Sequence, residues 1–259
     1  MHPFRTSLSF AWGHWAGSAW RFIRLFGAAT TQISTYPLRY REPRGLSKYL
    51  RKRFQSYYWS DFRLWAQDHA KAELQDFASR IRAQRLSDPT LGTFVLLDRS
   101  RFDLTDSVTV LGCTLWSAIP PALFETVARG LRDFTRVQNW TVKDYTNSHA
   151  RDLEWLTNEC AAIRAQEPHR RVIVLSHHAP TRHGTSAPQH ANSPLTSAFA
   201  TELTTHTVWA SPITVWAFGH THHNSDQVLK GIRVVSNQRG YDGTEAISSG
   251  FSKDFTVRV

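Results

Sequence analysis

Residues 213–224 read ITVWAFGHTHHN, and this stretch decides the fold that the sequence predicts. Residues 213–218 form a short apolar run, typical of a buried strand. The run ends at Gly219, where the backbone can turn sharply, and His220, His222 and His223 follow within four residues. Binding sites in α/β sheets lie just outside the carboxyl ends of the strands. Because neutral imidazole is a common ligand of transition metals, the stretch predicts metal-binding histidines at a sheet edge.

A second stretch has the same organisation. Residues 171–180 read RVIVLSHHAP, a β-branched strand followed by His177 and His178 and stopped by Pro180. A lone histidine in such a place is more often a loop residue with satisfied hydrogen bonds than a ligand. Two strands that each end in histidines instead favour a shared metal site.

Both stretches carry a family resemblance. The motif V-x-S-H-H-x-P (residues 174–180), followed by F-G-H-T-H (residues 218–222), resembles the last two signature blocks of the calcineurin-like metallophosphoesterases. The likeness runs from about Ala70 to the C-terminus. Four further blocks are similar to a fungal-type subgroup of that family: LGCTLWS (111–117), HHAPTRHGTSAP (177–188), NSPLTSAFATEL (192–203) and VVSNQRGYDG (234–243).

The resemblance implies an α/β fold, the calcineurin-like α/β/β/α sandwich, incomplete at its N-terminus. It also implies a metal-dependent phosphoric ester hydrolase, in which water attacks in line a phosphate held by two divalent ions (Mn, Fe or Zn). His177 and His220 would bind one ion and His222 the other, and His178 would assist them without binding an ion itself. Arg182, in the following polar loop, is a candidate for binding a phosphate oxygen through its planar guanidinium, the alternative being a solvated surface residue.

Residues 1–64 differ in composition from the rest of the chain. They hold eleven of the 31 Lys and Arg residues against two acids, so nearly all of the net charge of +10 belongs to this segment. The sequence therefore divides into a basic, disordered or mistranslated segment (1–64) and the C-terminal part of a phosphoesterase domain (65–259). A basic segment also suits a nucleic acid or an acidic membrane surface, which keeps a binding function through residues 1–64 as an alternative.

The family's N-terminal motifs, D-x-H, G-D and G-N-H-E, are not written in this chain. Codons can be chosen for residues 10–15 and 41–47 that read L-L-G-D-I-G and G-N-H-E-A-Y when shifted by one base. The two matches share one phase and lie about as far apart as the family spaces these motifs. We therefore expect that the first 64 residues are an out-of-frame or mis-spliced reading of the missing metal-binding half, and that this chain as written is either truncated and inactive or derived from a complete hydrolase.

The remaining features set the expected elements and surroundings. Amphipathic spacing predicts helices over residues 65–85 and 142–166, and apolar runs predict strands over 94–98 and 108–112 with a polar connection between them. Two cysteines without metal-type spacing favour a reducing, cytoplasmic location, whereas an Arg-rich N-terminus free of early acids would suit a mitochondrial transit peptide. We expect a phosphoester substrate as partner, no nucleic acid and no membrane; the sequence does not indicate the oligomeric state.

Overall fold

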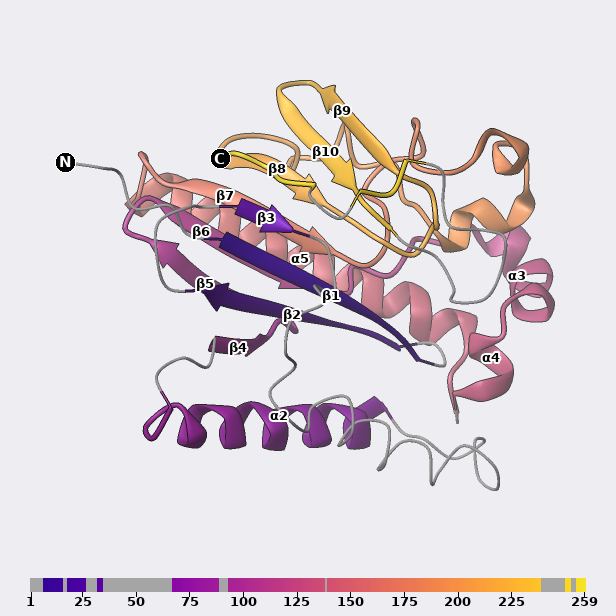
Figure 1. The fold of residues 1–259 in the computed structure, drawn as a ribbon. Helices are drawn as coiled ribbons and strands as arrows, with labels where there is room; N and C mark the ends of the chain where they lie inside the picture. The colour runs from indigo at the N-terminus through magenta and orange to yellow at the C-terminus, as the bar shows by residue number, and fades with distance from the viewer. Residues whose placement is uncertain are drawn as a thin grey trace.

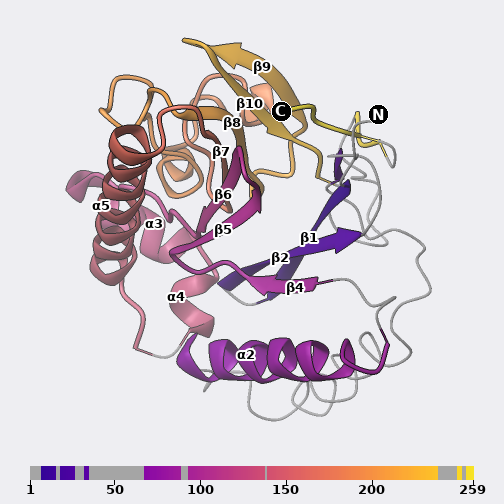
Figure 2. The same cartoon turned by 90° about the vertical axis from the view of Figure 1, so that its left-hand side faces the viewer.

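The computed structural model describes residues 7–15, 18–26, 32–34, 67–88, 93–137, 139–238, 250–252 and 255–259, the first three ranges through their backbone. The chain forms two β-sheets with helices on their outer sides (Figures 1 and 2). In the described ranges, no helix has both the length and the apolar character needed to cross a bilayer.

A six-stranded sheet carries the centre of the fold. Its strand order is β5 (Ser100–Thr105), β6 (Val108–Cys113), β7 (Arg171–Ser176), β8 (Ile213–Ala217), β10 (Ile232–Ser236) and β9 (Ser225–Leu229). The four inner strands are parallel, while β5 and β9 pair antiparallel at the two edges. Parallel strands bring their carboxyl ends to one edge of the sheet, so the histidines that follow β7 and β8 meet there.

The inner strands are buried on both faces, as expected of a parallel sheet. Side chains alternate along each strand between two apolar clusters, so that on β7 Val172 and Val174 enter one cluster while Ile173 and Leu175 enter the other. The first cluster packs against helix α5 (Val142–Gln166). Both cysteines lie buried in it as free thiols, and burial raises the pKa of Cys160 to about 12.

Helix α5 is the crossover that links two parallel strands, β6 and β7. Thr141 caps its N-terminus in a capping box, in which the Thr141 side chain accepts from the Asp144 amide and the Asp144 carboxylate accepts from the Thr141 amide. Such a cap supplies acceptors for backbone N–H groups that have no hydrogen-bond partner within the first turn of the helix. The helix bounds agree with the range predicted from the sequence.

A second sheet covers the other face of the six-stranded sheet. Its strand order is β3 (Gln32–Ser34), β1 (Ser7–Trp15), β2 (Ser18–Phe26) and β4 (Thr93–Leu96), and helix α2 (Gln67–Gln84) lies on its outer side (Figure 2). Phe77 of α2 meets Phe94 of β4 edge-on, with ring centroids 4.9 Å apart. The order of layers is therefore α5, six-stranded sheet, four-stranded sheet, α2, which confirms the expected α/β/β/α arrangement.

Short helices and loops lie beyond the carboxyl edge of the six-stranded sheet. They are η1 (Pro121–Leu123), α3 (Phe124–Gly130), α4 (Asp133–Arg136), η2 (Pro188–His190) and η3 (Pro194–Ala198). A third apolar cluster joins η1, α3, α4 and η3 to the start of α5 through side chains that include Trp116, Tyr145 and Ala198. This cap brings aromatic residues next to the histidines.

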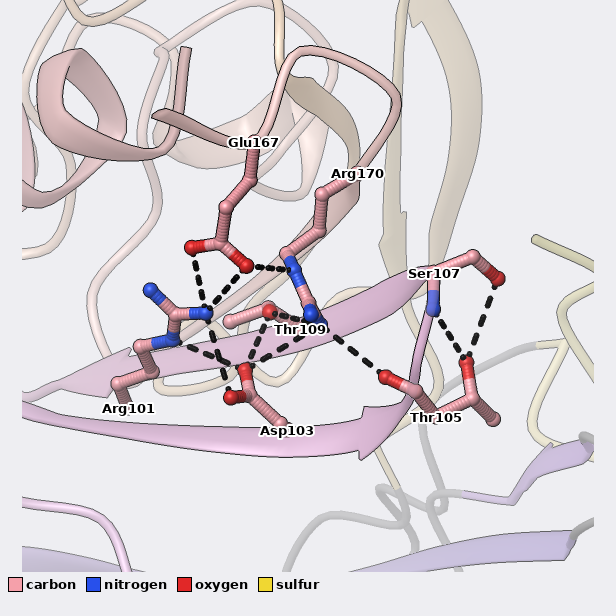
Figure 3. Close-up of polar contacts among 7 residues, drawn as sticks. All are labelled: Arg101, Asp103, Thr105, Ser107, Thr109, Glu167 and Arg170. Atoms are coloured by element: carbon pink, nitrogen blue, oxygen red, sulfur yellow. Dashed lines mark hydrogen bonds and ion pairs between the residues drawn. The ribbon is translucent and has the colours of Figure 1, made fainter. Parts of the chain in front are cut away.

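A polar network ties the sheet together at its opposite, amino edge (Figure 3). Arg101 on β5 binds Asp103 on the same strand and Glu167 at the end of α5, with N–O distances of 2.9 and 2.7 Å. Arg170, just before β7, donates to the Thr109 hydroxyl at 3.0 Å and pairs with Glu167 at 2.5 Å. The network therefore joins β5, β6, the end of α5 and the start of β7.

Two features of the fold differ from the sequence prediction. The polar stretch between the predicted strands contains β5, an edge strand whose Phe102 and Leu104 pack inward while Arg101 and Asp103 alternate with them. Residues 1–64, expected to lack well-formed strands, contain β1, β2 and β3. The reason is visible in β1, where SLSFAWGHW alternates small or polar residues with larger ones at the period of a strand. The division of the chain at residue 64 stays a prediction.

Candidate metal centre

Three histidines meet at the carboxyl edge of the six-stranded sheet. One possible ligand atom of each of His177, His178 and His220 lies within 4.8 Å of the others. The ring centroid of His220 lies 4.5 Å from that of His177 and 4.4 Å from that of His178. His177 and His178 are buried and His220 is partly buried. Imidazoles gathered at this spacing suit a zinc-type or related transition-metal ion.

The backbone of His177 and His178 is fixed by both neighbouring strands. Their two amides donate to the carbonyl of Thr114, which follows β6, at 3.3 and 3.2 Å. The His177 carbonyl accepts from the amide of Gly219, which follows β8, at 3.0 Å. The parallel pairing of β6, β7 and β8 therefore continues past the strand ends and places the histidine pair between the two neighbouring loops.

The loop after β8 holds its histidines in an unusual backbone conformation. His220 and His222 both have positive φ, at 70° and 52°. The left-handed region costs a non-glycine residue about 1–2 kcal/mol, so contacts around the loop must offset it. Gln238, two residues beyond β10, supplies such contacts, accepting from the His222 amide at 2.8 Å and donating to the His223 carbonyl at 2.9 Å.

The ring of His178 is oriented by side chains from two other elements. Its Nδ1 lies 3.0 Å from the hydroxyl of Ser117, in the loop after β6, and 3.4 Å from that of Tyr145 on α5. Tyr145 donates its hydroxyl to the carbonyl of Ala198 at 2.5 Å, and burial raises its pKa well above the usual value. Neutral hydroxyls on Nδ1 fix the rotation of the imidazole, as metal-binding histidines require.

Helix α5 also holds the loop that carries Ser117. Leu115 and Trp116 in this loop have positive φ, at 67° and 43°. The buried carboxylate of Asp152 accepts from the Leu115 amide at 2.7 Å, and His149 donates from Nδ1 to the Leu115 carbonyl at 2.7 Å. The two side chains stand one helical turn apart on α5, so that they hold both polar groups of one strained residue.

The electrostatics of these two supports follow from their burial. Burial raises the pKa of Asp152, although Arg99 binds the carboxylate at 2.8 Å and acts in the opposite direction. Burial lowers the pKa of His149, against the effect of its hydrogen bonds to backbone carbonyls. The Arg99 guanidinium and the Asp152 carboxylate therefore form an ion pair behind the loop that carries Ser117.

An aromatic ring covers one side of the histidine group. Phe199, directly after η3, stacks on His220 with ring centroids 4.4 Å apart and an interplanar angle of 20°. The rings of Trp116 and His178 are also neighbours, with their centroids 5.6 Å apart. These rings restrict how the imidazoles can turn and lower the local polarity, which strengthens any electrostatic interaction made there.

The structure places the predicted site residues as follows. His177 and His220, predicted to share an ion, lie together, and His178, predicted only to assist, belongs to the same group of three. His222 lies in the same loop as His220 but outside that group, and burial lowers its pKa. Arg182 is exposed in the loop after β7, where its amide donates to Glu202 at 3.3 Å. The assignment of His222 to a second ion and of Arg182 to phosphate stays a prediction.

Several residues that build the site were missed by sequence reasoning. Three of them reach a histidine across many residues of sequence: Ser117, Tyr145 and Gln238. Asp152 reaches the Leu115 amide, in the loop that presents Ser117. The one available signal was local: Ser117 and Asn237–Gln238 fall in blocks that share the family resemblance. His149 is likewise buried, and its ring donates to the Leu115 carbonyl.

No family model matches the chain. A protein of Acanthamoeba polyphaga mimivirus named "Uncharacterized protein L509" is 24% identical over 182 residues, covering 65% of this chain and 61% of the viral protein. The chain thus spans less than two thirds of that relative's length. The crystal structure of phosphopantetheinyl hydrolase (PptH) from Mycobacterium tuberculosis shares 14% sequence identity at a TM-score of 0.37, covering 56% of this chain and 54% of that one. Similarity at this level assigns neither a fold nor an activity.

Proposed function

We propose that this chain is a metal-dependent phosphoric ester hydrolase whose metal centre is built on His177, His178 and His220. The observation that carries the proposal is the meeting of these three imidazoles at the carboxyl edge of a parallel sheet. The sequence blocks around them resemble the calcineurin-like metallophosphoesterases, in which histidines after two neighbouring strands bind the metal ions. The α/β/β/α layers agree with that resemblance.

The donor set fits a divalent transition-metal ion. Imidazole nitrogens suit zinc, iron and manganese, and a group of three, two of them buried, offers enough ligands for one ion with positions left open. Such an ion would supply Lewis-acid polarisation of a phosphoryl oxygen. Ser117 orients the ring of His178, and the Thr114 carbonyl binds the backbone amides of His177 and His178. These contacts keep the proposed ligands in place before an ion binds.

The chain's own residues would then bind and orient the substrate. Arg182 stands exposed in the loop that directly follows the histidine pair, and its guanidinium is the group we propose for binding phosphate oxygens. This loop is anchored at its base, because Thr181 donates to Glu202 at 2.8 Å and Gln227 donates to the His183 carbonyl at 2.5 Å. An anchored loop positions a binding residue at lower entropic cost than a free one.

The test is hydrolysis of a simple aryl phosphate with added Mn²⁺, Zn²⁺ or Fe²⁺, together with calorimetric titration of the metal-free protein. We expect metal-stimulated turnover and a binding isotherm, both lost in His220→Ala. His169→Ala is the matched control, since His169 is an exposed histidine at the opposite edge of the sheet. Metal binding that survives His220→Ala unchanged would contradict the proposal.

A second candidate is a metal-binding protein without turnover. It is favoured by the make-up of the histidine group, which contains no carboxylate. A bridged pair of hard divalent ions needs carboxylate oxygens beside imidazoles, so the group by itself fits one ion better than two. Binding of one ion per chain with no turnover on any phosphoester would decide for this candidate, whereas two ions with turnover would decide for the hydrolase.

A further inference from the structure

The loop after β8 needs an external support to keep its histidines in place. Both His220 and His222 adopt left-handed backbone conformations, which glycine accepts readily and histidine does not. Within the loop, the Thr221 amide donates to the Gly219 carbonyl at 2.8 Å, which forms only a tight local turn. A loop with two strained residues relaxes unless groups from outside bind its backbone.

Gln238 binds this backbone through both ends of its side-chain amide. Its Oε1 accepts from the His222 amide at 2.8 Å, and its Nε2 donates to the His223 carbonyl at 2.9 Å and to the Thr221 hydroxyl at 3.0 Å. Its own backbone amide donates to the Asn224 side chain. Gln238 is 6% exposed, so water does not compete strongly for these bonds.

The position of Gln238 in the fold makes it a rigid support. It follows β10, which pairs in parallel with β8 in the interior of the sheet, so its backbone is fixed relative to the strand that carries the histidine loop. Asn237 beside it exchanges two hydrogen bonds with Ser252, at 2.8 and 2.9 Å, which holds the segment from its other side. Ser236 adds a second donor to the His223 carbonyl at 2.7 Å.

We propose that Gln238 is the positioning residue of the metal centre: by holding the Thr221–His223 backbone it keeps the strained histidine loop ready for an ion and so sets the metal affinity. The proposal rests on the proposed metal site. The primary amide of Gln238 offers a donor and an acceptor on one short, planar group, and the loop uses both. A side chain of similar size without these atoms would fill the space, but it would remove the Gln238 acceptor from the His222 amide and leave the His223 carbonyl with Ser236 alone of these two donors.

The test compares Gln238→Leu with the wild-type protein in three measurements. Leucine keeps most of the volume and removes the hydrogen bonds. We expect Zn²⁺ affinity, measured by competition with a chelator, to fall about 10- to 100-fold, the range found for residues that orient metal ligands. We also expect an altered absorption spectrum of the Co²⁺-loaded protein, and faster hydrogen exchange of the His222 amide in the metal-free protein.

Gln227→Ala is the matched control. Gln227 also uses its side-chain amide to bind a backbone carbonyl in a loop at this edge, but that carbonyl belongs to His183 and not to the loop after β8. The control should leave the Zn²⁺ affinity within about threefold of wild type and the Co²⁺ spectrum unchanged, by the same reasoning. A loss of general stability would change the melting temperature of either variant, but it would not change the spectrum.

The outcomes separate this inference from the proposed function. If wild-type protein binds Zn²⁺ and Gln238→Leu binds it equally well with the same Co²⁺ spectrum, the inference is wrong and the metal site stands. If wild-type protein binds no ion, the proposed function fails, and the exchange of the His222 amide still tests the support. If Gln238→Leu does not fold, fast exchange of that amide in the metal-free wild type overturns the inference, and slow exchange supports it.

Discussion

At the scale of single residues, the site is a set of histidines whose surroundings differ more than their sequence positions suggest. His178 has its Nδ1 beside Ser117 and Tyr145, and its ring lies 4.4 Å from that of His220. His222 is held through its backbone by Gln238 and lies outside the group of three. The proposed metal centre therefore takes His178, and not His222, as its third ligand.

This difference gives a prediction for single substitutions. His178→Ala should weaken binding of the first metal ion by more than the 10- to 100-fold typical of supporting residues, because a ligand is lost outright. His222→Ala should leave the first binding constant within about threefold and affect only a second ion, if one binds. Titration of each metal-free variant with Zn²⁺ measures both constants. The opposite order, with His222→Ala abolishing the tight site, would refute the assignment.

Other residues matter because they hold strained backbone rather than because they face the site. Asp152 and His149 bind the two polar groups of Leu115, whose φ is positive, and the same loop presents Ser117 to His178. Burying the Asp152 carboxylate costs desolvation free energy, which its ion pair with Arg99 offsets only in part. Asp152 has a structural role that accounts for this cost, because its carboxylate holds the loop that carries Leu115 and Ser117.

At the scale of elements, the six-stranded sheet has two differently stabilised edges. The carboxyl edge holds strained loops and histidines, while the amino edge holds the network of Arg101, Asp103, Thr109, Glu167 and Arg170 (Figure 3). Exposed ion pairs contribute little individually, but a network that joins two strands and a helix end stabilises their register. The polar network and the strained histidine loops therefore lie at opposite ends of the same parallel strands.

The network makes stability depend on pH. Burial would raise the pKa of Asp103, but hydrogen bonds from Arg101 and Thr109 outweigh this effect and lower the pKa below its usual 3.8. A hydrogen bond from Arg101 also lowers the pKa of Glu167. A carboxylate with a lowered folded-state pKa stabilises the protein above its unfolded-state pKa and loses this contribution as the pH falls through the folded-state value. The stabilisation should therefore begin to decline at about pH 4 and be lost progressively as the pH falls further.

Asp103→Asn tests this expectation. The variant should melt at a lower temperature than wild type at pH 7, and the two melting temperatures should converge as the pH falls below about 4. Because the Asp103 side chain is 48% exposed, solvent screening should keep the difference below about 1 kcal/mol. Scanning calorimetry across this pH range measures it, with Asp106→Asn, in the neighbouring turn, as the control. A constant difference at all pH values would show that charge is not its cause.

How far the sequence predicts these elements depends on how local their signals are. Helix α5 was predicted with its observed bounds, because its apolar period lies within one continuous stretch of sequence. Strand β5 was missed because an edge strand alternates Arg101 and Asp103 with apolar residues and resembles a polar loop. His177 and His220 were predicted from strand-end motifs, whereas Gln238 and Asp152 act across 16 and 37 residues and leave no local pattern.

At the scale of the whole molecule, the central question is what covers the inner face of the six-stranded sheet. Apolar side chains of its inner strands form that face: Val110, Ile173, Leu175, Val215 and Val235. Among the described side chains, those packed against it from outside the sheet include Val95 on β4, Leu97 and Val257. Strands β1 and β2 lie over the same face, and β4 joins the second sheet by pairing with β2 (Figure 2).

Removal of residues 1–64 should therefore destabilise the protein. The truncated chain would lose β1, β2 and β3, leaving β4 as a single strand, and a single strand does not form a stable layer by itself. Each valine, leucine or isoleucine side chain returned to water costs about 1.5–3 kcal/mol, so exposing a few of them approaches the total stability of an ordinary domain. We expect a lower melting temperature, binding of a hydrophobic dye and aggregation through the exposed sheet.

The measurement is thermal unfolding of residues 65–259 beside the full chain, with a chain lacking only residues 1–6 as control, because that deletion leaves β1 intact. The sequence-based division at residue 64 predicts the opposite result, since a basic segment outside the domain contributes nothing to its core. Equal melting temperatures and no dye binding would establish that division and show that β1–β3 are dispensable. A collapse of stability on removing residues 1–64, but not residues 1–6, would show that the six-stranded sheet, which carries the histidines, depends on the second sheet that the N-terminal strands build.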